Sequence, residues 1–250
     1  ISEYDYYKSD FTNETLGFDI QQNIKLNEKN DVTFGGEYYE TDVENIRSYG
    51  KKISIKNKAI YLEDRWKLDD TWQFNTGLRY DKHNMYGSEV TPKIALNKKI
   101  NDDSNVYLSW GKVFNAPTVD EMFDNSMGIS NPNLQPEKGD VWTLGLNTKL
   151  SEDTSLSASV YYNKIDDAID WRSIDPSDPI APWRAENVNK EERKGLEISL
   201  NHNFNDYITG YASYTYMQIK QDLGKGFVRD SKEKPNTYRA GLKYKNAGWI

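Results

Sequence analysis

The chain has 250 residues, a formal net charge of -7 and a mean hydropathy of -0.88, which suits one large domain without an oily core. It has no cysteine, no basic stripe for nucleic acid and no apolar run near the ~20 residues of a membrane-spanning helix, so disulfides, thiolate metal sites and a helical membrane protein are excluded. Its 18 tyrosines and 7 tryptophans recur at regular spacing, which disfavours disorder. The chain begins at Ile1 without a start methionine or signal peptide, so we expect it to be an internal piece of a longer protein.

The first regular segment alternates apolar and polar residues with a period of two. Leu16, Phe18 and Ile20 occupy one face, and Gly17, Asp19 and Gln21 occupy the other. This period is typical of a strand that lies between an apolar and a wet environment. The same pattern recurs and predicts about eleven strands, at residues 14–26, 31–43, 55–68, 71–84, 90–100, 104–113, 137–150, 154–168, 187–204, 207–221 and 236–245.

The length of these strands favours a membrane barrel over a soluble sheet. Strands of globular proteins average about 5 to 6 residues, whereas a strand that crosses a bilayer at a tilt needs ~9 to 11. Aromatic residues such as Trp72 and Tyr80 also fall near the ends of the apolar faces, where membrane interfaces would lie. The alternative is ordinary aromatic packing in a large soluble β protein.

Short and long connections alternate along the chain. The short ones, such as Asn27 to Asp31 and Asn205 to Asp206, contain the Asn, Asp, Gly and Ser residues of hairpin turns. The long ones lie near residues 44–54, 85–89, 114–136, 169–186 and 222–235. One rim of the sheet should therefore carry nearly all of the irregular chain, as the outer rim of a bacterial membrane barrel does.

The connection at residues 114–136 is proline-rich and follows no helical or strand period. Pro117, Pro132 and Pro136 fix φ and push the residues before them toward extended geometry. We therefore expect a stiff external loop, with Glu137 opening the next strand. The residues expected to brace the base of this loop are Phe114, Ala116, Pro117, Asn131, Pro132, Leu134, Pro136 and Glu137.

The strand count predicts an open sheet. The first and last of eleven meandering strands run in the same direction, so they cannot close an antiparallel barrel, and bacterial single-chain barrels have even strand numbers. Trp249 and Ile250 begin a further strand. We therefore predict an all-β fold, a partial arc of a larger antiparallel transmembrane barrel. The side expected to face a polar lumen bears Asp19, Arg79, Asp81, Glu197, Arg239 and Lys243.

Several segments, in this order, resemble the carboxy-terminal part of the barrel of TonB-dependent outer-membrane receptors. They are GLRYD, SWGKVFNAPTVDEMF, NPNLQPEKGDVWTLGL, SASVYYNKIDDAI, NVNKEERKGLEISL, YASYTY and KPNTYRAGLKY. The resemblance covers residues 14 to 249, and the FxAP and NPxLxPE pair is its most specific part. It implies that the whole chain is part of the barrel domain of a 22-stranded receptor, whose amino-terminal plug and last strands lie outside this sequence.

The resemblance further implies a function in the bacterial outer membrane. Such receptors bind a scarce, bulky metal chelate at external loops and import it with energy from a TonB-type protein, which acts through a coupling box that this sequence lacks. A ferric siderophore is the cargo we expect, with cobalamin or haem as the alternative. Haem receptors of the family carry a ligating histidine between the two loop motifs, but residues 118–130 contain none; Met122 and Met127 are the soft donors there.

Two further loops carry residues suited to ligand contact. Trp171, Arg172, Trp183 and Arg184 combine flat apolar rings with guanidinium groups, which suits an anionic, aromatic ferric complex. The candidates that add to them are Phe227, Arg229, Lys225, Arg47 and Tyr49. The alternative is that these are solvated loop residues or contacts with lipopolysaccharide.

No resident cofactor or metal and no catalytic residue is expected. Asp166, Asp167, Asp170, Asp175 and Asp178 are the candidate calcium ligands, but they lack the spacing of a defined calcium loop. The two histidines, His83 and His202, belong to no catalytic motif, so we expect no enzyme. A passive porin or a barrel for surface interaction is the alternative from another class, and a plug domain upstream would discriminate against it.

Overall fold

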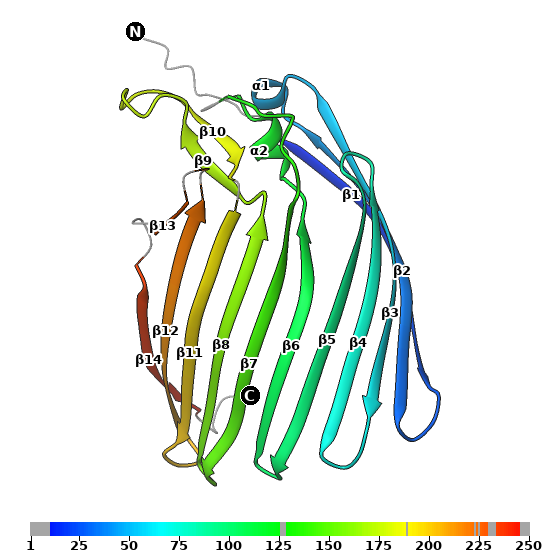
Figure 1. Cartoon of the computed structure of the whole chain (residues 1–250), viewed down its shortest axis with the longest axis vertical. Coiled ribbons are helices and arrows are strands. Elements are labelled where there is room, and N and C mark those ends of the chain that lie inside the picture. Colours follow the sequence, from blue (N-terminus) through cyan, green and yellow to red (C-terminus); the bar gives the residue numbers. More distant parts are fainter. Residues whose placement is uncertain are drawn as a thin grey trace.

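The structure, a computed structural model, describes residues 11–125, 129–188, 190–222, 224, 226–229 and 234–245. Eleven long strands form a curved antiparallel wall in which each strand pairs with the next along the chain (Figure 1). They are β1 (Thr12–Lys25), β2 (Asn30–Glu44), β3 (Lys52–Lys67), β4 (Trp72–His83), β5 (Gly87–Asn101), β6 (Ser104–Asn115), β7 (Glu137–Ser151), β8 (Thr154–Asp166), β11 (Lys190–Asn203), β12 (Ile208–Asp222) and β14 (Asn236–Tyr244). These bounds confirm the predicted strands to within a few residues.

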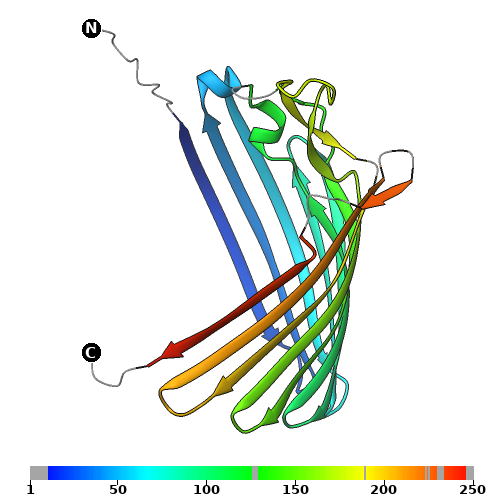
Figure 2. The same cartoon turned by 90° about the vertical axis from the view of Figure 1, so that its left-hand side faces the viewer.

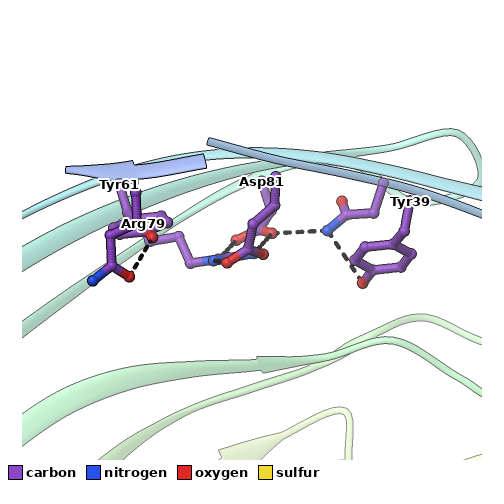
Figure 3. Close-up of polar contacts among 7 residues, drawn as sticks. Tyr39, Tyr61, Arg79 and Asp81 are labelled. Carbon is purple, nitrogen blue, oxygen red and sulfur yellow. Dashed lines mark hydrogen bonds and ion pairs between the residues drawn. The ribbon is translucent and has the colours of Figure 1, made fainter. Parts of the chain in front are cut away.

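The sheet is an open arc, as the sequence predicts. Strand β1 forms one free edge and β14 lies at the other, across a wide gap (Figure 2). Figure 3 shows the polar side chains of Tyr39, Tyr61, Arg79 and Asp81 pointing from the strands into the space that the arc encloses. The concave face is therefore the lumen side.

The convex face is apolar along the cross-strand register. Leu144 lies opposite Leu108 on one side and Val160 on the other, and Val160 lies opposite Leu196. Paired residues share a face of the sheet, so these side chains form a continuous row. At the edge strand, Leu16 keeps 69% of its surface exposed. Apolar side chains with so much exposure fit a wall that is solvated by lipid.

Side-chain caps hold the tight turns at one rim. The Oδ1 atom of Asn27 accepts hydrogen bonds from the backbone N–H of Lys29 (2.8 Å) and of Asn30 (2.9 Å). Asp69 and Asn205 cap their turns in the same way. Asn and Asp favour such turns because their short side chains can imitate a backbone acceptor. The turn expected at residues 246–248, with Trp249 and Ile250, lies outside the described residues.

The opposite rim contains more regular structure than the sequence predicts. The connection at 44–54 includes the short helix α1 (Ile46–Tyr49), and the proline-rich connection includes α2 (Val119–Phe123). The connection at 169–186 is largely a hairpin of β9 (Ile169–Ser173) and β10 (Trp183–Asn187), and residues 222–235 include β13 (Phe227–Arg229), paired with β12. The expectation of irregular loops here is wrong at these four segments. Within the described part, neither helix is long and apolar enough to cross a membrane.

Two glycines on the concave face lie directly beneath tyrosine rings. A Cβ atom on Gly145 would clash with the ring of Tyr107, and one on Gly195 would clash with that of Tyr161. The missing side chain lets each ring lie flat against the neighbouring strand, so these glycines serve close packing, where a glycine inside a strand otherwise weakens it.

A charge on the convex face should destabilise the wall. Leu144→Arg places a guanidinium at the midpoint of β7, and we expect it to lower the free energy of unfolding in lipid by about 2–4 kcal/mol. Ser157→Arg is the control, because Ser157 lies on the concave face opposite Asn147 and Ser199. Denaturant titration of the complete protein folded into lipid vesicles measures both variants. Equal costs for the two variants would contradict the assignment of the faces.

Candidate ligand-binding cap and lumen chamber

Four connections fold together into one layer over the rim, which we call the cap: residues 45–51, 84–86, 116–125 with 129–136, and 167–188. In one apolar cluster of the cap, Tyr49 packs with Val43 and Ile53, and Val119 and Phe123 of α2 pack against them. In the other cluster, the fully buried Ala185 of β10 packs with Met122 and Leu134. The cap therefore has a small apolar core, one part of which it shares with the ends of β2 and β3.

Hydrogen bonds join α1 to α2. The phenol of Tyr49 donates to the Oδ1 atom of Asp120, and the backbone N–H of Asn125 donates to the carbonyl of Ser48 at 2.9 Å. Burial and this carboxylate raise the pKa of the Tyr49 phenol, so it stays a donor at physiological pH. The side chain of Asn45 caps α1 by accepting from Ser48, and Gly50 ends the helix at a φ of 69°.

Helix α2 begins with a capping box. The hydroxyl of Thr118 accepts from the backbone N–H of Glu121, and the Glu121 carboxylate accepts from the N–H of Thr118. The T-x-x-E spacing at residues 118–121 is the signal for this helix, and a search for period alone misses it. Tyr86 donates to the carbonyl of Pro117 (3.2 Å) and to the sulfur of Met122, and burial raises the pKa of Tyr86 to about 12.

The NPNLQPE motif lies against the hairpin β9–β10. The Nδ2 atom of Asn131 donates to the carbonyl of Ala185 at 2.9 Å, and Leu134 is 2% exposed in the second cluster. The backbone N–H of Gln135 donates to the side chain of Asn187 at 2.8 Å. Pro136 is buried and Pro132 is exposed. The motif and the hairpin thus share both hydrogen bonds and apolar contacts.

Glu137 links three elements at the base of the cap. Its Oε1 atom accepts from the backbone N–H of Ile169 (2.7 Å), and its Oε2 atom accepts from Asn115 (2.8 Å). Of the FxAP motif, Pro117 is buried, and Phe114 and Ala116 are half-buried. These residues fix how the cap meets β6 and β7.

The two tryptophans of the hairpin lie on one face. Trp171 pairs with Ala185, and Trp183 pairs with Ser173, so the rings are diagonal neighbours on that face. They are 38% and 45% exposed. They therefore present flat apolar surface on the cap, at the entrance to the lumen, which we call the mouth.

The two arginines of the hairpin are already paired. Arg172 forms a 3.0 Å ion pair with Asp170 and donates to Gln221 of β12 at 2.8 Å, while Arg184 forms an ion pair with Glu186. Gln221 in turn donates to the buried Glu191 at 2.9 Å. This polar chain ties the hairpin to the lumen wall.

The other candidates are not gathered at the tryptophan face. Phe227 and Arg229 are exposed on β13, which pairs with β12. Asp175 and Asp178 cap turns by accepting from Ser177 and Ile180, and hydrogen bonds from Ser177 lower the pKa of Asp175. Lys225, Met127 and the side chain of Arg47 lie outside the described part. Among the described residues, no group of three or more His, Cys, Asp or Glu side chains is arranged to hold a metal ion.

A cavity of about 600 Å³ opens on the lumen side directly below the cap, and we call it the lumen chamber. Its lining combines polar wall residues with the FxAP motif: Tyr39, Asn57, Arg79, Asp81, Phe114 and Pro117. Figure 3 shows the polar network here, in which Asp81 accepts from Asn57 at 3.0 Å and from Arg79 at 2.8 Å. Strand alternation places Arg79 and Asp81 in the lumen, whereas Tyr39 and Asn57 join them only through cross-strand register.

An open wall with an apolar outside, a polar inside and a folded cap at one rim is the architecture of part of an outer-membrane β-barrel. The family model for the β-barrel of TonB-dependent receptors matches residues 2–250, and the chain belongs to this family. Its relatives include a vitamin B12 transporter of Photobacterium profundum, which is 29% identical over 219 residues, 85% of this chain and 34% of the relative. The chain thus spans about a third of that relative. Localisation in the outer membrane follows from the family.

Solved structures share the fold at low sequence identity. A siderophore receptor, PirA of Pseudomonas aeruginosa, superposes with a TM-score of 0.71 and 16% identity, over 95% of this chain and 51% of that one. The copper transporter OprC superposes with a TM-score of 0.76 and 15% identity, over 95% and 42% of the two chains. The named relatives are transporters and receptors, and their cargoes differ.

Loss of the phenol at Tyr49 should loosen the link between the two helices. Tyr49→Phe leaves Asp120 without this donor, and we expect the local opening free energy of residues 44–51 and 118–125 to fall by about 1–3 kcal/mol. Amide hydrogen exchange of the complete protein measures it. Tyr38→Phe is the control, because it also removes a phenol–carboxylate bond, to Glu40, but on β2. Unchanged exchange in Tyr49→Phe would contradict the role of this bond.

Proposed function

We propose that the protein containing this chain captures a bulky metal chelate, a ferric siderophore, at the cap and imports it with energy supplied by a TonB-type partner. The observation that carries the proposal is the cap itself: four long connections pack around their own apolar clusters, directly above a chamber of about 600 Å³. A preformed site loses little conformational entropy when it binds a rigid ligand, and this chamber lies within the usual size range for small-molecule sites.

The contact surfaces suit a chelate with flat apolar parts. Trp171 and Trp183 present partly exposed rings on one face of the hairpin, and the chamber below adds apolar contacts from Phe114 and Pro117. Rings of this kind give a large contact area at a small entropic cost. A packed layer at this rim favours a site that holds a ligand over a passive pore.

Cobalamin is the second candidate cargo. The observation that favours it is the match to relatives named vitamin B12 transporters, at 29% and 30% identity. Haem has less support, because residues 118–130 offer no histidine. No resident cofactor or bound calcium is part of the proposal.

Growth of a deletion strain tests the proposed cargo. We expect loss of growth on ferric siderophores as the iron source and unchanged growth on cobalamin. Loss of growth on cobalamin alone would replace the siderophore with cobalamin, and normal growth under both conditions would contradict uptake of either. A complete protein that lacks a plug domain would favour a porin.

Removal of the two exposed rings should weaken ligand binding without unfolding the barrel. For Trp171→Ala combined with Trp183→Ala, we expect affinity for the ferric siderophore to fall at least about tenfold, because the mouth loses its flat apolar contacts. Isothermal titration of the purified complete protein measures it. The control is Trp66→Ala, which removes an exposed ring from the convex face near the opposite rim. Unchanged affinity in the double variant would make the hairpin rings solvated loop residues.

A further inference from the structure

The cationic groups at the mouth and in the lumen chamber are largely neutralised by carboxylates of the same chain. Arg79 is the clearest case. Its Nε atom donates to Asp81, its Nη1 atom donates to Glu37 at 3.0 Å, and its Nη2 atom donates to both carboxylates. These bonds occupy four of the five N–H groups of the guanidinium, which leaves little for a ligand.

The pairing extends to the cap. Arg172 and Arg184 of the hairpin hold Asp170 and Glu186. Lys112 also borders the chamber, but it pairs in register with Asp140 and shares a strand face with Leu108 of the convex wall, so alternation directs its ammonium away from the lumen. With Glu37 counted as the partner of Arg79, the chamber has one cation, Arg79, and two anions, Glu37 and Asp81. The formal charge of these three groups is therefore -1.

The remaining polar groups of the chamber are neutral. Tyr39 accepts a hydrogen bond from Asn57 at 3.3 Å and keeps its own O–H for a ligand acceptor, and Thr91 adds a hydroxyl. Phe114 and Pro117 are the apolar residues of the FxAP motif in the same lining. Hydroxyl, amide and apolar groups in this mixture match a ligand rich in amides and hydroxyls.

We propose that the lumen chamber selects cargo by charge: it takes a neutral chelate with amide and hydroxyl groups, and it discriminates against a polyanionic chelate. The inference rests on the proposed function and narrows its substrate class. A polyanion would have to lose water beside Glu37 and Asp81 while Arg79 stays occupied, so its charge would gain no compensating partner.

Binding of three probes to the purified complete receptor tests this selectivity. The probes are a ferric trihydroxamate chelate, which is neutral, a ferric tris-catecholate chelate of similar size, which is polyanionic, and cobalamin, which is rich in amides. Quenching of tryptophan fluorescence gives each affinity. We expect the neutral trihydroxamate to bind at least tenfold more tightly than the tris-catecholate, and equal or tighter binding of the tris-catecholate would overturn the inference.

The third probe separates the inference from the proposed cargo. If cobalamin binds and neither ferric chelate does, the siderophore proposal fails, while selection of a neutral, amide-rich cargo stands. If none of the three binds, the proposed function fails, and the inference that rests on it fails too.

Variants of the carboxylates test the physical cause. Glu37→Gln and Asp81→Asn each remove one anionic partner of Arg79. We therefore expect each variant to lower the ratio of the two affinities, neutral trihydroxamate over tris-catecholate, at least about tenfold. Asp31→Asn is the matched control: it removes the partner of Arg65, held at 2.6 Å on the same concave wall but outside the chamber lining. Circular dichroism and thermal unfolding establish that all three variants fold. An unchanged preference in the chamber variants, or an equal change in Asp31→Asn, would refute charge selection by this network.

Discussion

Backbone hydrogen bonding in lipid is the constraint on which the rest of the structure depends. No water is available there to satisfy N–H and C=O groups, so a chain without a spanning helix must cross as a continuous antiparallel ladder. The eleven long strands meet this demand through unbroken registers such as β2 with β3. Once the ladder is fixed, the period of two divides every strand into one lipid-facing and one lumen-facing row, and the chemistry of each face follows.

The same constraint explains why irregular chain gathers at one rim. Loops cannot lie in the hydrocarbon region, so a long connection must pack beyond it. Here four connections share apolar residues, and Phe123 packs against both clusters. Because the cap has its own contacts, its stability is partly separate from that of the wall. That separation allows the cap to keep a defined shape while the strands below it satisfy their backbone hydrogen bonds in the membrane.

Much of the wall was predictable from the sequence, because alternation is a local property. The predicted strands, the open arc and the polar lumen side all follow from residues two apart, such as Leu16 and Phe18. Structure within the long connections was harder to predict. Helix α2 depends on the short capping box at Thr118, and the hairpin β9–β10 depends on contacts of Ala185 with Met122 and Leu134, which are distant in sequence. Neither the capping box nor these long-range contacts produce a periodic pattern of apolar residues in the sequence.

The charge state of the site could not be predicted, because it depends on register. Arg79 and Glu37 are 42 residues apart and lie on strands that are not adjacent, so no spacing in the sequence links them. From the sequence alone, Arg172 and Arg184 are candidate cations for binding an anionic ligand. In the folded hairpin, each forms an ion pair with an acidic residue two positions away on its own strand. An arginine in a lumen or a loop offers a free positive charge to cargo only if the fold leaves that charge without a carboxylate partner. By that criterion, the pairing of charges within this chain, and not their number, determines which chelates its wall and cap can accept.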